Sequence, residues 1–159
     1  MSARPVIIGY DGSPMAEQAV REAAALFAPR PALVITVWEA GRVFEAATTP
    51  AFEAPPVTLG LPTGLEADQE VADAAQRTAE QGEALAHELG LEATGLAVAD
   101  QGTVADTLIR QADEHQAQAI VLGTHSRRRL VKQLLGSTSH DVLKRATCPV
   151  VLVRDEQQR

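Results

Sequence analysis

Residues 6–14 read Val-Ile-Ile-Gly-Tyr-Asp-Gly-Ser-Pro. The short apolar run at their start does not alternate with polar residues, which is typical of a strand buried on both faces of a parallel sheet. The Asp-Gly pair then predicts a turn. Ser13 can cap a helix, and Pro14 suits a first helical turn, where its missing N–H costs nothing. Apolar residues then recur at helical spacing as far as Phe27, so this stretch predicts a strand, a turn and a helix.

The rest of the chain repeats this alternation. Further strands are predicted over residues 33–38, 91–98, 119–123 and 149–153, and further helices over 65–89, 103–112 and 139–146. Five strands interleaved with four helices predict an α/β fold, a single open, mostly parallel sheet with helices on both faces. The length fits one domain spanning residues 1–159.

Two segments lack this pattern. Residues 41–64 are rich in Pro, Thr and Ala and show no clear period, and residues 155–159 form a polar tail. A loop of that length is unusual inside a compact domain unless it covers a site or is flexible. We therefore expect a long flexible loop over 41–64 and a short tail after the last strand.

Composition excludes several classes of protein. The net charge is −7, aromatic residues make up 3% and there is a single cysteine. An acidic chain does not offer the broad basic face that nucleic acid requires. No apolar run approaches the roughly 18 residues of a membrane span, and the start lacks the apolar region of a signal peptide. We expect a soluble cytoplasmic protein that binds neither nucleic acid nor membranes.

The polar residues that could carry function follow the predicted strands at their carboxyl ends. Residues 123–126 read Gly-Thr-His-Ser, and after nine residues the segment 136–139 reads Gly-Ser-Thr-Ser. Glycine and hydroxyl residues at a helix start present N–H groups and the positive helix end, a combination that favours phosphate. Residues 123–145 also carry a net charge of +5, which leaves −12 for the rest of the chain. The plainer interpretation is a capped turn beside a solvated basic face.

Other chemistry is not supported by the sequence. There is no Gly-x-x-x-x-Gly-Lys-Ser/Thr loop, no Gly-x-Gly-x-x-Gly after the first strand and no Gly-x-Ser-x-Gly elbow. His, Cys and acidic residues do not show the spacing of a metal site. We therefore predict neither a catalytic residue nor a metal ligand.

Taken together, these motifs resemble the universal stress protein family. Members typically show Gly, two residues, Gly, nine residues and Gly-Ser or Gly-Thr between the fourth strand and the last helix. This chain has the same spacing from Gly123 to Ser137, with Ser126 at the position of the second glycine. The first strand with its turn, the Gly102 turn and the closing Ala-Thr-Cys-Pro-Val-Val-Leu-Val-Arg are also similar, so the resemblance covers nearly all of the chain outside 41–64.

The resemblance implies an adenine nucleotide alpha hydrolase-like fold with strand order 3-2-1-4-5, and a homodimer paired through the last strand. It also implies a regulatory protein of the stress response that binds ATP, AMP or another adenine nucleotide, with or without Mg²⁺. Asp11 would lie by the adenosine, and Val37 would contact adenine through its backbone. Ribose and phosphates would lie along the segment after the fourth strand and the start of the last helix, at Gly123, Thr124, His125, Ser126, Gly136, Ser137 and Thr138.

One position departs from the family pattern. Ser126 stands where members have the second glycine of the loop. If that position requires a left-handed backbone, a Cβ costs about 1–2 kcal/mol, which corresponds to about tenfold in affinity. A serine hydroxyl that donates to phosphate would offset part of this loss. The alternatives are therefore a dimeric interaction module that has lost nucleotide binding and, less favoured, a slow ATPase.

Overall fold

The computed structural model describes residues 3–40, 64–100, 102–124 and 136–154 of the chain. Its strands are β1 (Val6–Gly9), β2 (Pro31–Trp38), β3 (Glu92–Ala99), β4 (Ala119–Gly123) and β5 (Val150–Val153). Its helices are α1 (Pro14–Phe27), α3 (Gly64–Glu88), α4 (Val104–Glu114) and α5 (Ser137–Arg145). All strand pairs are parallel, and the sheet order is β3-β2-β1-β4-β5, as predicted.

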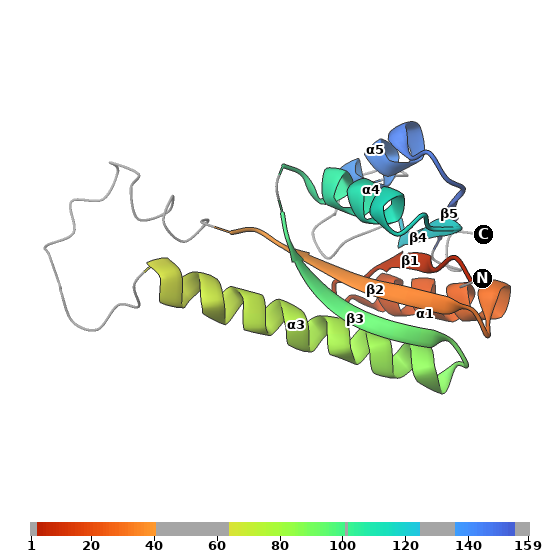
Figure 1. The fold of residues 1–159 in the computed structure, drawn as a ribbon, viewed down its shortest axis with the longest axis horizontal. Helices are drawn as coiled ribbons and strands as arrows, with labels where there is room; N and C mark the ends of the chain where they lie inside the picture. Colours follow the sequence, from red (N-terminus) through yellow and green to blue (C-terminus); the bar gives the residue numbers. More distant parts are fainter. Residues whose placement is uncertain (1–2, 41–63, 101, 125–135, 155–159) are drawn as a thin grey trace, which may run out of the picture.

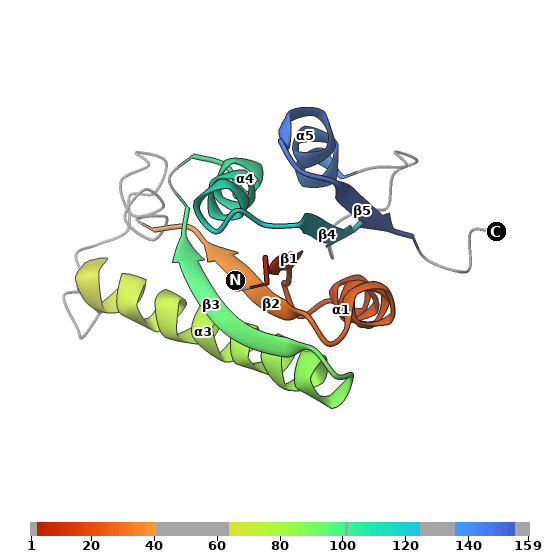
Figure 2. The same ribbon diagram turned by 45° about the vertical axis from the view of Figure 1, so that its right-hand side comes forward.

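Helices cover both faces of the sheet. In Figure 1, α4 and α5 lie above the strands, and α1 and α3 lie below them; the turned view of Figure 2 shows the same two layers. The buried aliphatic side chains accordingly form two clusters. Val6, Ile8 and Val34 belong to the cluster between the sheet and helices α1 and α3, whereas Ile7 and Ile35 belong to the cluster between the sheet and helices α4 and α5. Adjacent residues of β1 thus enter opposite cores, which explains why that strand is apolar throughout.

Several predicted boundaries need correction. The strand expected from residue 33 begins at Pro31, because a proline needs no N–H partner at the first position of a strand. The helix expected over 139–146 begins two residues earlier, at Ser137, with Gly136 as its N-cap. Thr103 caps α4 with a capping box, in which the Thr103 and Asp106 side chains each accept a backbone N–H of the other residue. Of the predicted flexible loop at 41–64, residues 41–63 lie outside the described residues, as does the tail at 155–159, whereas Gly64 is the first residue of α3.

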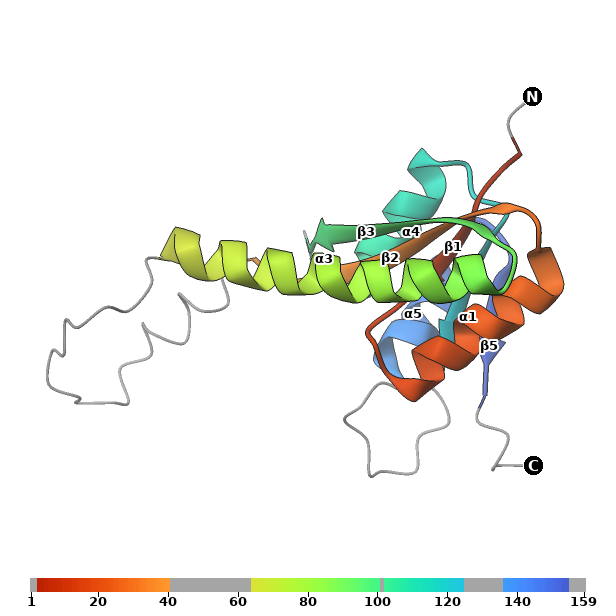
Figure 3. The ribbon, with the colours of Figure 1, turned by 90° about the horizontal axis from the view of Figure 1, so that it is seen from below.

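The two edges of the sheet differ. Odd-numbered residues of β3 turn their backbone groups away from β2, and side chains of α3 bind them. The Glu83 carboxylate accepts the Gly95 N–H at 2.6 Å, and the Gln76 side-chain amide accepts the Ala97 N–H at 3.0 Å while donating to the Gly95 C=O at 3.3 Å. Figure 3 shows α3 running along β3 and extending past the sheet. At the other edge, no hydrogen bond within the described part of the chain engages the outward-facing backbone groups of β5 at Val150 and Leu152.

None of the helices in the described ranges is both long enough and apolar enough to cross a membrane.

Candidate functional site

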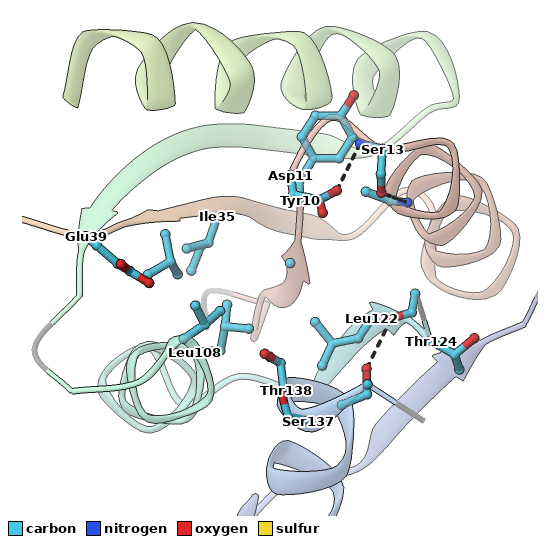
Figure 4. A pocket seen from close by; sticks show the side chains of 17 residues that line it. Tyr10, Asp11, Ser13, Ile35, Glu39, Leu108, Leu122, Thr124, Ser137 and Thr138 are labelled. Carbon is cyan, nitrogen blue, oxygen red and sulfur yellow. Dashed lines mark hydrogen bonds between the residues drawn. The ribbon is translucent and has the colours of Figure 1, made fainter. Parts of the chain in front are cut away.

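The strongest candidate site is a pocket of about 510 Å³ at the carboxyl ends of the strands. Residues at the ends of β1, β2 and β4 line it together with the first turns of α1, α4 and α5 (Figure 4). Here β1 and β4 are neighbours, while the chain continues from β1 to β2 on one side and from β4 to β5 on the other. In open α/β sheets, ligands bind at this reversal of strand order.

One half of the pocket is apolar. Ile35 and Val37 of β2, Val104 and Leu108 of α4 and Leu122 of β4 line this half, and Figure 4 shows Ile35 and Leu108 on opposite sides of it. Ile35, Val37 and Glu39 are two residues apart and therefore point to the same face of the sheet. An apolar slot with two facing aliphatic walls suits a flat ring better than a charged group.

Val37 presents more than its side chain to this slot. The pairing of β1 with β2 ends at Gly9 and Ile35, and the next hydrogen bond runs from the Tyr10 N–H to the Ile35 C=O at 2.9 Å. Since backbone groups of alternate residues point to the same side of a strand, those of Val37 point where β1 has already ended. A donor and an acceptor from one residue therefore border the apolar half of the pocket.

The other half of the pocket is polar and lies at the start of α5. Ser137 is exposed and Thr138 is half-buried, and both hydroxyl residues line the pocket. The first hydrogen bond of α5 runs from the His140 N–H to the Gly136 C=O at 3.0 Å. The N–H groups of residues 137–139 come before it in the chain and have no acceptor within the helix, as in the first turn of any helix. They leave a concentration of donors and positive helix potential at the pocket wall.

Other polar groups of this segment fix its position. The Gly136 N–H donates to the Thr124 C=O at 3.1 Å, and the buried Ser139 hydroxyl donates to the Gly123 C=O at 3.1 Å. Thr124 itself donates its N–H to the Val153 C=O at 2.9 Å. These hydrogen bonds join the start of α5 to the ends of β4 and β5, so the donors that remain at Ser137 and Thr138 are held in a fixed direction.

The two motif glycines, Gly123 and Gly136, differ in whether the structure could accommodate a side chain there. A Cβ on Gly123 would lie 2.9 Å from the Met15 carbonyl oxygen, so the backbone of α1 occupies the space that a side chain needs. A Cβ on Gly136 would lie 3.4 Å from the Thr124 carbonyl oxygen, an ordinary contact, and the φ angle of Gly136 is −65°. The resemblance places Gly123 beside the ribose and phosphates, but packing of α1 against β4 by itself already requires a glycine there.

Asp11 belongs to the turn that follows β1. Its carboxylate accepts the Ser13 N–H at 2.9 Å, and Ser13 in turn caps α1 by accepting the Ala16 N–H at 3.1 Å. Gly12 between them has a φ of +74°, which favours glycine. Asp11 is exposed and lies across the pocket from Ser137 and Thr138 (Figure 4). It is therefore held by the turn with a carboxylate oxygen available to a ligand.

Tyr10, just before this turn, is buried and points its ring toward α3. Burial, with smaller contributions from the Glu17 and Asp11 carboxylates, raises the pKa of the Tyr10 phenol. The phenol therefore stays protonated at neutral pH.

The walls formed by α4 and α5 are tied together outside the pocket. The Arg145 guanidinium at the end of α5 donates to the Asp106 carboxylate in the first turn of α4 at 2.5 Å. Hydrogen bonds from Thr103 and Arg145 hold the pKa of Asp106 below its usual value. This pair links the helix that carries the apolar wall to the helix that begins the polar wall.

The structure brings most of the predicted site residues together. Seven of the nine line this one pocket: Asp11, Val37, Gly123, Thr124, Gly136, Ser137 and Thr138. His125 and Ser126 lie outside the described residues, as do Arg127, Arg128, Arg129 and Lys132 of the basic segment. No group of three or more His, Cys, Asp or Glu side chains able to hold a metal occurs among the residues that the structure describes.

Sequence reasoning missed the apolar half of the site and part of its rim. The residues not predicted are Gly9, Tyr10, Ser13, Ala16, Ile35, Glu39, Val104, Leu108, Leu122 and Ser139. Their spacing marked most of them as core, which many of them also are. The one available signal was position, because each lies in the last residues of a strand, in the turn after it, or in the first turns of a helix.

Comparison with known proteins is consistent with this geometry. The model of the universal stress protein family matches residues 2–154. The chain belongs to the universal stress protein family. A Thermus aquaticus relative, named as a universal stress protein in the QAH/OAS sulfhydrylase 3' region, is 29% identical over 155 residues, which is 95% of this chain and 98% of that protein.

Solved structures of universal stress proteins share the fold, which is adenine nucleotide alpha hydrolase-like. One from Archaeoglobus fulgidus in complex with dAMP is 23% identical, with a TM-score of 0.66, and the match covers 96% of this chain and 98% of that one. Another, in complex with cAMP, is 21% identical, with a TM-score of 0.62, and the match covers 97% and 98%. At these identities the likeness concerns the fold, and the ligands are those of the two neighbours.

Proposed function

We propose that this universal stress protein binds an adenine nucleotide in the pocket at the carboxyl ends of its strands and acts as a regulator. The observation that carries the proposal is the division of that pocket. An apolar slot bordered by the backbone of Val37 adjoins a wall of N–H donors and hydroxyls at Ser137 and Thr138. A nucleotide has the same division, with a flat base at one end and phosphate at the other.

The proposed orientation follows from matching these halves. The base enters between Ile35 and Val37 on one side and Leu108 on the other, and the phosphates reach the start of α5. Asp11, across the pocket, is then near the ribose, where a carboxylate can accept hydrogen bonds from hydroxyl groups. Two structural neighbours have dAMP and cAMP in their complexes, which supports the same class of ligand here.

Calorimetry tests the proposal and identifies the nucleotide. We expect ATP, AMP or cyclic AMP to bind with a dissociation constant of about 1 mM or tighter, and GTP to bind more weakly. Titrations with and without Mg²⁺ show whether the cation accompanies the phosphates. Mass spectrometry of the supernatant from heat-denatured protein shows whether a nucleotide purifies with the chain. Absence of heat with every adenine nucleotide at millimolar concentration would overturn the proposal.

Binding without turnover is the favoured activity. Asp11 and Glu39 are the two carboxylates that line the pocket among the described residues, and one oxygen of Asp11 already accepts the Ser13 N–H. A hydrolase would also need a group that positions water against the terminal phosphate. Steady ATP turnover that survives purification and disappears in Asp11→Ala would instead favour the slow ATPase.

The regulator pairs with a second copy of itself through β5. This strand forms one edge of the sheet, and its backbone groups at Val150 and Leu152 face outward. The opposite edge, at β3, is occupied by Gln76 and Glu83. An edge with open donors and acceptors invites strand pairing, and a blocked edge does not.

Light scattering at micromolar concentration should therefore give twice the chain mass of 16.9 kDa. Val150→Pro removes one outward N–H without removing a hydrogen bond to β4, and we expect it to shift the protein toward monomer. A wild-type monomer would refute the pairing. A dimer that binds no nucleotide would instead favour the alternative of a protein-interaction module.

A further inference from the structure

The hydrogen-bonded ladder between β1 and β2 ends one hydrogen bond before the point that continued parallel pairing would reach. In a parallel pair, the Tyr10 N–H donates to the Ile35 C=O, and the Tyr10 C=O would then accept the N–H of Val37. The first of these hydrogen bonds is present at 2.9 Å. The second is not formed; within the part of the chain that the structure describes, no group accepts the Val37 N–H.

The Tyr10 carbonyl has a different partner. The hydroxyl of Thr36 donates to it at 2.8 Å, and this hydroxyl is buried, because only 8% of Thr36 is exposed. The position of Thr36 is fixed independently, since its backbone pairs with β3 at Ala97. A buried carbonyl needs a hydrogen-bond donor, and here a side chain supplies the donor that the backbone of Val37 would otherwise supply.

We propose that Thr36 is a positioning residue for the nucleotide base. Its hydroxyl occupies the Tyr10 carbonyl and thereby keeps the Val37 N–H open to the pocket. The Val37 N–H and C=O then form a donor–acceptor pair at the apolar slot, matched to the ring nitrogen and the 6-amino group of adenine. This inference rests on the proposed function for its ligand, whereas the hydrogen bond that it assigns to Thr36 is a property of the protein alone.

Removal of the hydroxyl tests the inference. In Thr36→Val, the shape of the side chain is kept and the Tyr10 carbonyl loses its donor. An unsatisfied buried carbonyl is unfavourable, so we expect the Tyr10 C=O to accept the Val37 N–H instead. That N–H would then no longer be available to a base in the pocket. The affinity for ATP should fall about tenfold, the effect of one hydrogen bond. The affinity for inorganic tripolyphosphate, which has no base, should stay within about twofold of wild type.

Amide hydrogen exchange measures directly, and without any ligand, whether the Val37 N–H is hydrogen-bonded. In the wild-type protein the Val37 amide should exchange much faster than that of Ile35, whose N–H lies in the ladder with β1. In Thr36→Val the Val37 amide should become protected. Thr36→Ser keeps the hydroxyl, so it should retain both the fast exchange of Val37 and the wild-type affinity.

Thr107→Val is the matched control. Thr107 is also buried, and its hydroxyl also donates to a backbone carbonyl, that of Thr103 at 3.1 Å, but it does not line the pocket. This variant should lose stability without changing the exchange of Val37 or the affinity for ATP.

The outcomes separate the inference from the proposed function. If the Val37 amide exchanges equally fast in wild type and Thr36→Val, the inference is wrong, even if ATP binds. If the Val37 amide becomes protected in Thr36→Val but no adenine nucleotide binds to the wild type, the role of Thr36 in the ladder stands and the base-binding role falls with the proposed function.

Discussion

Replacing Ser137 with glutamate should lower the affinity for ATP by about 10- to 100-fold, equivalent to about 1.4–2.7 kcal/mol, while the free energy of unfolding stays the same or rises. Ser137 is the first residue of α5, is exposed and lines the pocket. An acidic side chain in the first turn of a helix interacts favourably with the helix dipole, typically by about 0.3–1 kcal/mol. The same charge repels a polyphosphate at that helix start, so binding and stability should change in opposite directions.

Two variants separate charge from bulk and from position. Ser137→Gln adds almost the same volume without charge and should retain affinity within about threefold. Leu65→Glu adds the same charge to the first turn of α3, at a residue that is 84% exposed and does not line the pocket, so it should leave the affinity unchanged. Calorimetry at two salt concentrations gives the affinities, because screening weakens an effect of charge. Equal affinities of Ser137→Glu and wild type would show that the phosphates do not lie at the start of α5.

The fold could be predicted from the sequence because its signals are local and repeat. The run from Val6 to Ile8 is apolar without alternation, since its residues enter opposite cores, and the Ser13-Pro14 start of α1 uses a cap that a sequence displays directly. Boundaries were less predictable where no side chain marks them. The start of α5 is an example, because Gly136 caps it without a side-chain hydrogen bond.

The candidate site was predictable where polar residues interrupt the pattern and not where apolar residues continue it. Asp11, Ser137 and Thr138 stand out because hydroxyl and carboxylate groups follow strands and begin a helix. Leu108 and Leu122 carry no such mark, since a leucine that lines a pocket and one that fills a core have the same spacing. The contact between the Thr36 hydroxyl and the Tyr10 carbonyl joins residues 26 apart in sequence, and only the divergence of β1 from β2 reveals it.

Motif glycines are a further case in which residues of one type have different roles. In sequence, Gly123 and Gly136 are equivalent members of one spacing. In the structure, α1 requires the absence of a side chain at Gly123, whereas the backbone around Gly136 accommodates one. Alanine at these two positions should therefore differ in its cost to stability, although both variants should bind nucleotide more weakly.

Gly123→Ala should lower the free energy of unfolding by about 1–3 kcal/mol, the usual cost of overpacking. Its Cβ would lie 2.9 Å from the Met15 carbonyl oxygen and 3.1 Å from the Met15 carbonyl carbon, so the first turn of α1 must move away from β4. Because Ser13 and Asp11 lead into that turn, affinity for the nucleotide should fall as a secondary effect of the movement.

Gly136→Ala should weaken binding directly, with little loss of stability. Its φ of −65° suits alanine, and its Cβ makes an ordinary 3.4 Å contact, so the free energy of unfolding should change by at most about 1 kcal/mol, the usual range for an N-cap substitution. The added methyl group lies at the pocket wall, where it should hinder close approach of a phosphate and weaken ATP binding. Urea unfolding followed by circular dichroism gives the stabilities, and calorimetry gives the affinities. If both alanine variants lost the same stability, the distinction between a glycine required by packing and a glycine that serves the site would be wrong.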